Sequence, residues 1–89
     1  MKHASAETLR ELEPLLAHLR RIDSLCERKP GIFYRGSSAF LHFHEDPAGL
    51  FADVKLEGQH FERMPVSSEH QRREFIAAVR ERFSTRSRA

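Results

Sequence analysis

Cysteine is almost absent from this 89-residue chain, which contains Cys26 alone. A single cysteine cannot close an internal disulfide, and it excludes zinc sites built from paired CxxC motifs. The chain also lacks an apolar run of the roughly 20 residues that a membrane-spanning helix needs. Residues after Met1 do not form the apolar region of a secretion signal. We therefore expect a soluble protein of the reducing cytoplasm.

Signatures of phosphate-binding loops and of nucleophilic enzymes are also missing. No glycine-rich segment matches a nucleotide-binding fingerprint, and no Gly-x-Ser-x-Gly elbow is present. The composition, 39% hydrophobic and 31% charged, is that of an ordinary folded domain. The length predicts a single domain over residues 1–89, with 1–4 and 84–89 as mobile tails.

Charge is unevenly distributed, although the net charge is only +2. Residues 30–62 contain five acidic and two basic residues, whereas residues 63–89 contain seven arginines and three glutamates. The arginine-rich end raises one alternative function, weak nucleic-acid binding through the C-terminal helix. Against it, the interleaved glutamates are typical of a solvated helix, and the aromatic residues lie in the acidic segment instead.

Apolar spacing predicts helices at both ends of the chain. Leucines at helical spacing indicate a turn or short helix over residues 5–12 and a main helix over 13–27. Pro30 ends that helix because it disfavours helical geometry at the residue before it. Ser68 and Gln71 have capping-box spacing, which predicts the start of a C-terminal amphipathic helix.

The middle of the chain changes to a period of two residues, which is typical of strands. Three segments separated by glycine-containing loops predict a three-stranded antiparallel meander: residues 32–35, 39–45 and 50–56. Residues 61–66 predict a short fourth strand, which Pro65 restricts to an edge. The sequence thus predicts an α+β fold.

Two assumed hairpin loops give the predicted register of this sheet. The loop at 46–49 pairs Glu45 with Leu50 and, further along, His42 with Asp53. The loop at Gly36-Ser37 adds these pairs: Tyr34 with Ala39, Ile32 with Leu41, and Phe33 with Phe40. One face is then apolar, and the other face combines phenylalanines with histidines and charged residues.

That second face is the predicted functional surface. Its predicted ligand- or partner-binding residues are Phe33, Arg35, Phe40, His42, His44, Phe51 and Asp53. Three phenylalanines on a solvated sheet face suggest a cover, such as a helix, a ligand or a second copy of the chain. The leading hypothesis is a non-catalytic binding or protein-interaction module, which forms a homodimer or binds an unidentified protein or small ligand and needs no cofactor.

A metal-dependent enzyme is the rival hypothesis from another class. His42 and His44 project to one side of a strand, and Asp53 lies across the hairpin, with His60 as a fourth candidate ligand. Such a set suits zinc or non-haem iron. The structural alternative is a His42–Asp53 hydrogen bond with His44 beside a phenyl ring. We assign no catalytic residue, because no serine or cysteine lies well placed to complete a triad.

Three stretches resemble segments of small uncharacterised bacterial α+β proteins with a helix–meander–helix plan. They are residues 31–36 (GIFYRG), 40–44 (FLHFH) and 52–56 (ADVKL). The resemblance implies a bacterial origin and an α+β fold over about residues 12–83, and it supplies no activity.

Overall fold

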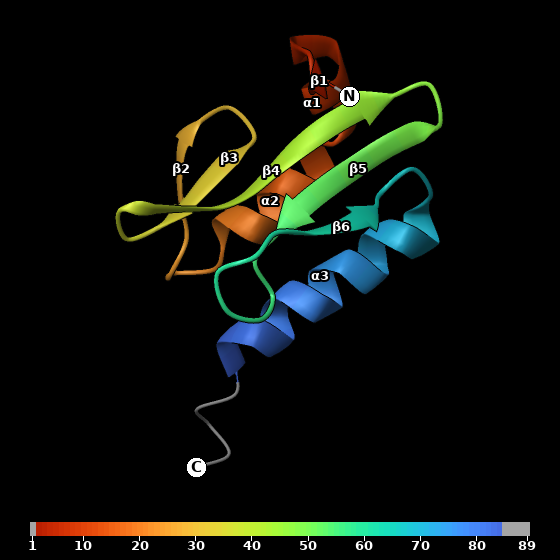
Figure 1. Ribbon diagram of the computed structural model, residues 1–89. Coiled ribbons are helices and arrows are strands. Elements are labelled where there is room, and N and C mark those ends of the chain that lie inside the picture. Colours follow the sequence, from red (N-terminus) through yellow and green to blue (C-terminus); the bar gives the residue numbers. More distant parts are fainter. Residues whose placement is uncertain (1, 85–89) are drawn as a thin grey trace.

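The computed structural model describes residues 2–84 and shows a sheet with helices packed on one side of it (Figure 1). The elements in chain order are β1 (Lys2–His3), α1 (Ala6–Glu11), α2 (Glu13–Arg20), β2 (Cys26–Lys29), β3 (Ile32–Arg35), β4 (Ser38–Asp46), β5 (Gly49–Val54), β6 (Glu62–Pro65) and α3 (Glu69–Ser84). None of the helices in this part of the chain is both long and apolar enough to cross a bilayer.

The sheet is antiparallel, with strand order β2-β3-β4-β5-β6. The short strand β1 lies off this path and pairs with the second half of β4. The predicted α+β class and antiparallel sheet are confirmed, and β6 is the predicted edge strand that ends at Pro65. The predicted count of three strands was too low, since β1 and β2 were not foreseen.

Strand β2 replaces the end of the predicted 13–27 helix, which stops at Arg20. Lys29 pairs with Ile32, so Pro30 and Gly31 form a two-residue hairpin loop. Gly31 has φ +75°, which suits the third position of a tight turn that follows proline. The Pro-Gly pair was interpreted only as a helix terminator. As a result Cys26, expected on the apolar helix stripe, is an exposed strand residue.

The register of β4 against β5 is the predicted one. His42 lies opposite Asp53, and Glu45 lies opposite Leu50. The register of β3 against β4 is only partly correct, because it shifts between Phe33 and Tyr34. Tyr34 pairs with Ala39 as predicted, whereas Phe33 pairs with Leu41 and not with Phe40.

This β-bulge changes the face on which two predicted surface residues lie. Phe33 is fully buried in the core, and Phe40 is 3% exposed, with its ring 5.2 Å from that of Phe83 on α3. An extra residue in one strand interrupts the alternation of side chains, so residues beyond the bulge turn to the other face. The prediction that Phe33 and Phe40 form part of the open surface is therefore wrong.

Helices α2 and α3 pack on the same face of the sheet (Figure 1). The ring of Phe43 on β4 lies 6.0 Å from that of Phe75 on α3. The core comprises Leu12, Leu15, Leu16, Leu19, Leu25, Phe33, Phe40, Leu41, Phe43, Ala52, Val54, Val66, Phe75 and Val79. With the helices on one side, the opposite face of the strands carries histidine and charged side chains.

The predicted cap of α3 is confirmed. The Ser68 hydroxyl accepts from the backbone N–H of Gln71 at 3.1 Å, and Gln71 Oε1 accepts from the N–H of Ser68 at 3.0 Å. These reciprocal bonds satisfy backbone donors that a helix start otherwise leaves unpaired.

Candidate metal centre

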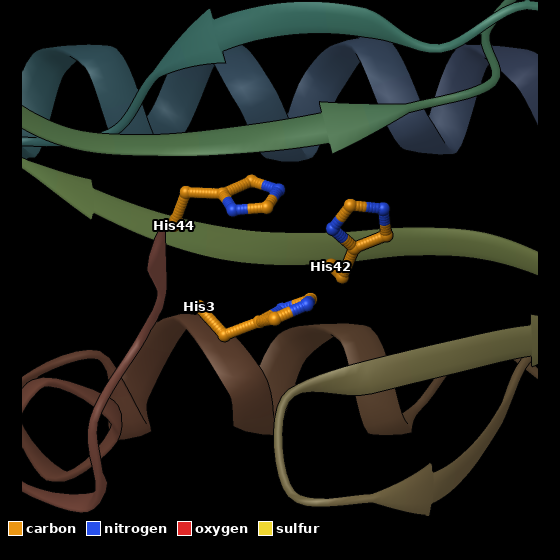
Figure 2. A group of neighbouring side chains, drawn as sticks. All are labelled: His3, His42 and His44. Carbon is orange, nitrogen blue, oxygen red and sulfur yellow. The ribbon is translucent and has the colours of Figure 1, made fainter. Parts of the chain in front are cut away.

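Three imidazoles from two strands lie together on the open face of the sheet (Figure 2). We call His3, His42 and His44 the histidine cluster. His42 and His44 project from the same side of β4 because one residue separates them. The ring centroids are 4.7 Å apart for His42 and His44, 5.1 Å for His3 and His44, and 5.7 Å for His3 and His42.

His3 enters this cluster through the pairing of β1 with β4. It lies directly opposite His44. The Ala4 N–H donates to the Phe43 carbonyl at 3.1 Å, and the Ser5 N–H donates to the Glu45 carboxylate. These bonds continue the attachment beyond β1 and hold the imidazole of His3 over β4.

Asp53 lies beside the cluster and is held by Arg63 of β6. Arg63 donates from Nε to Oδ1 at 3.0 Å and from Nη2 to Oδ2 at 3.3 Å. Asp53 Oδ2 also lies 3.0 Å from Nε2 of His44, an ion-pair distance without hydrogen-bond alignment. The carboxylate therefore faces His44, not the directly opposite His42 that the sequence suggested.

The pKa of Asp53 lies below its usual value. Burial of the carboxyl opposes ionisation, but the hydrogen bonds and positive charge of Arg63 outweigh it. The pKa of His42 is also lowered, chiefly by burial and next by its neighbour His44. At neutral pH the site thus combines an ionised carboxylate with a neutral imidazole at His42, the form in which histidine binds metal ions.

Ring nitrogens in the cluster lack partners. Nδ1 of His42 and both ring nitrogens of His44 are buried, and within residues 2–84 they accept or donate no hydrogen bond. Buried polar atoms in proteins are nearly always satisfied, so each such atom calls for an explanation. All three atoms belong to His42 and His44, whose rings are in mutual contact, so one ligand can reach both side chains.

The other predicted site residues lie at the edge of the histidine cluster or away from it. Phe51 is half-buried opposite His44, and His60, the predicted fourth ligand, is exposed and lies outside the histidine cluster. Phe61, which was not singled out, is 42% exposed and has its ring 4.9 Å from that of His42. Arg35 lies away from the cluster, near Phe83.

The predicted site lacks His3 because the sequence predicts residues 1–4 to be a tail, whereas Lys2–His3 form strand β1. A signal was nevertheless present: the predicted strand over 39–45 is longer than its predicted neighbour over 32–35. The unpaired half of the longer strand needed another partner for its backbone groups. Strand β1 supplies that partner, and it carries His3 into the site.

Three of the arginines assigned to the nucleic-acid alternative have acidic partners within the protein. Arg72 donates to the Val66 carbonyl at 2.7 Å and pairs with Glu11. Arg73 pairs with Glu69, and Arg63 is bound to Asp53. Arg86 and Arg88 lie outside the described residues. These contacts neutralise part of the positive charge that nucleic-acid binding requires.

Comparison with known proteins adds no relative. No family model, curated protein or solved structure matches the chain. The bacterial origin implied by the resemblance therefore stays a prediction.

Proposed function

We propose that this protein binds one divalent transition-metal ion, with zinc as the reference case, through His3, His42 and His44. The observation that carries the proposal is the unpartnered Nδ1 of His42 and of His44 within a group of three imidazoles. Imidazole is a ligand for zinc, copper, nickel and iron, and a metal ion satisfies buried lone pairs that no protein donor reaches.

The nitrogens of the histidine cluster have to move closer together to bind one metal ion. One nitrogen from each imidazole lies within 4.8 Å of the others. With zinc–nitrogen bonds of about 2.0–2.1 Å, a tetrahedral site places two ligand nitrogens roughly 3.3–3.4 Å apart. His3 is exposed, so rotation of its side chain can bring its nitrogen inward while His42 and His44 stay fixed on β4.

Asp53 is suited to orient a ligand instead of binding the ion itself. Its carboxylate already accepts two hydrogen bonds from Arg63 and faces Nε2 of His44. This contact leaves Nδ1 of His44 for the metal. Carboxylates that hold the second nitrogen of a ligating histidine fix its tautomer and orientation.

Three protein ligands leave one coordination position for water or a small ligand. The proposal takes up the metal ligands His42 and His44 of the rival hypothesis and adds His3, and it assigns no reaction to the ion. Burial of Phe33 and Phe40 removes two of the apolar anchors that favoured a protein partner or homodimer on this face. The structure thus supports a metal ion better than it supports a large apolar partner.

Competition against a chromophoric chelator tests the proposal in the full-length chain. We expect the wild-type protein to bind one equivalent of Zn²⁺, and Co²⁺ to give the visible absorption of a nitrogen-rich site. The variants H3A, H42A and H44A should each lose at least about tenfold in affinity, since one of three ligands is removed. H60A is the matched control, because His60 is an exposed histidine outside the cluster.

Circular dichroism of each metal-free variant separates loss of a ligand from loss of the fold. At a zinc concentration 100 times Kd, binding should raise the free energy of unfolding by about 2.7 kcal/mol. Equal zinc affinity for H42A, H60A and the wild type would contradict the proposal.

A further inference from the structure

A separate polar cavity of about 180 Å³ lies at the end of the sheet near the β3–β4 hairpin. It is bounded by that hairpin, by the segment after β5 and by the C-terminal part of α3. Its lining residues are Arg35, Ser38, Ala39, Phe40, Lys55, Gly58, Gln59 and Arg82. We call it the cationic cavity, because three of these side chains are basic and none is acidic.

In the described part of the chain, the three cations of this cavity have no carboxylate partner. Within residues 2–84, Arg35, Lys55 and Arg82 form no ion pair. By contrast, Arg20, Arg63, Arg72 and Arg73 each pair with an acidic residue. Three cations thus line one concave site without an acidic side chain of the described residues to neutralise them.

Aromatic rings hold these cations in place. The guanidinium carbons of Arg35 and Arg82 lie 5.3 and 5.9 Å from the centre of the Phe83 ring. Lys55 Nζ lies 5.0 Å from the centre of the Phe61 ring. A ring face attracts a cation without neutralising it, so the positioned groups keep their capacity to bind an anion.

We infer that the cationic cavity binds a phosphate monoester group. Two arginines supply planar forks that match phosphate oxygens, and Lys55 adds a third positive charge. The hydroxyl of Ser38 and the amide of Gln59 are further donors in the lining. Three cations suit a dianion better than the single charge of a carboxylate.

The size of the cavity limits the ligand to a small group. Pockets for whole organic ligands usually occupy about 300–1,000 Å³, and one water accounts for roughly 30 Å³ in the liquid. The cavity thus accommodates a phosphate and the atoms next to it, with the remainder of a larger molecule outside.

This site is independent of the proposed metal centre. Phe61 lies between them, since its ring contacts both His42 and Lys55. The two sites share no candidate ligand residue. Failure of one proposal therefore leaves the other standing, provided that phosphate binding is measured on metal-free protein.

The test is an NMR titration of the metal-free, ¹⁵N-labelled full chain with phenyl phosphate and with inorganic phosphate at constant ionic strength. We expect saturable shifts at Ser38, Gln59 and the backbone around Lys55. R35Q, K55Q and R82Q should each weaken binding about tenfold or more, the effect expected for loss of a hydrogen bond to a charged group. R10Q, at an exposed arginine of α1, should leave the affinity unchanged.

Three further measurements distinguish binding of a phosphate monoester from other kinds of anion binding. Affinity for phenyl phosphate should rise between pH 5 and pH 7.5, as the ester acquires its second charge. R35K should bind phenyl phosphate more tightly than R35Q, because lysine keeps the positive charge. It should bind less tightly than the wild type, because lysine lacks the planar guanidinium. The inference would be overturned if the protein bound a single-stranded oligonucleotide but neither phosphate compound. It would also be overturned if R10Q and the three cavity variants bound phenyl phosphate with equal affinity. The unchanged spectrum of distant residues shows that each variant is folded.

Discussion

Oδ2 of Asp53 lies 3.0 Å from Nε2 of His44, while Arg63 donates two hydrogen bonds to the same carboxylate. The three side chains come from neighbouring strands, β4, β5 and β6. The position of the imidazole therefore depends on a carboxylate that is itself fixed by a guanidinium. Such an arrangement lowers the freedom of His44 before any ion arrives, which reduces the cost of ordering it on binding.

Replacement of Asp53 tests this positioning role. D53N removes the charge that faces His44 and leaves Arg63 without its anionic partner. We expect zinc affinity to fall about 10–100-fold, the usual range for an outer-shell carboxylate, while one ion still binds. The measurement is the same chelator competition. D23N, at an exposed aspartate outside the sheet, is the matched control and should bind like the wild type.

The second prediction compares two phenylalanines, of which one is buried and the other is exposed. Phe33 is fully buried, whereas Phe61 is 42% exposed. F33A should lower the free energy of unfolding by about 3–5 kcal/mol, because it removes core contacts and leaves a cavity. F61A should cost about 1 kcal/mol, since only part of its ring is withheld from water. Urea unfolding of both variants makes the comparison, and equal losses would contradict the core position of Phe33.

The part of the sheet that follows from local rules could be predicted from the sequence. The turn at residues 46–49, together with alternating apolar residues, defines the pairing of Glu45 with Leu50 and of His42 with Asp53. The loop at Gly36-Ser37 defines the pairing of Tyr34 with Ala39. The bulge beside Phe33 could not be predicted in this way. The bulge places Phe33 in the core and Phe40 against Phe83 of α3, and the second contact depends on the position of a helix far along the chain.

In the candidate site, too, some residues follow from the local sequence pattern and others depend on tertiary pairing. A period of two residues was enough to place His42 and His44 on one face and Asp53 beside them. His3 and Arg63 were not assigned to the site, because each arrives on a strand whose partner is set by tertiary pairing. Short strands of two and four residues carry too little periodic pattern to indicate which face or neighbour they adopt.

Glu27 on β2 gives the third prediction, a dependence of stability on pH away from both proposed sites. Hydrogen bonds from Arg20, which also pairs with Glu13, lower its pKa most; burial opposes this, and the Gly31 N–H adds a further bond at 2.9 Å. A carboxyl whose pKa is lower in the folded state stabilises the fold above its unfolded pKa of about 4.5, and that contribution is lost as pH falls through the folded value. E27Q should therefore cost about 1–2 kcal/mol at pH 7 and progressively less towards pH 3 in urea unfolding. E7Q, at an exposed glutamate of α1, serves as the control, and a constant difference between E27Q and the wild type at both pH values would refute this assignment.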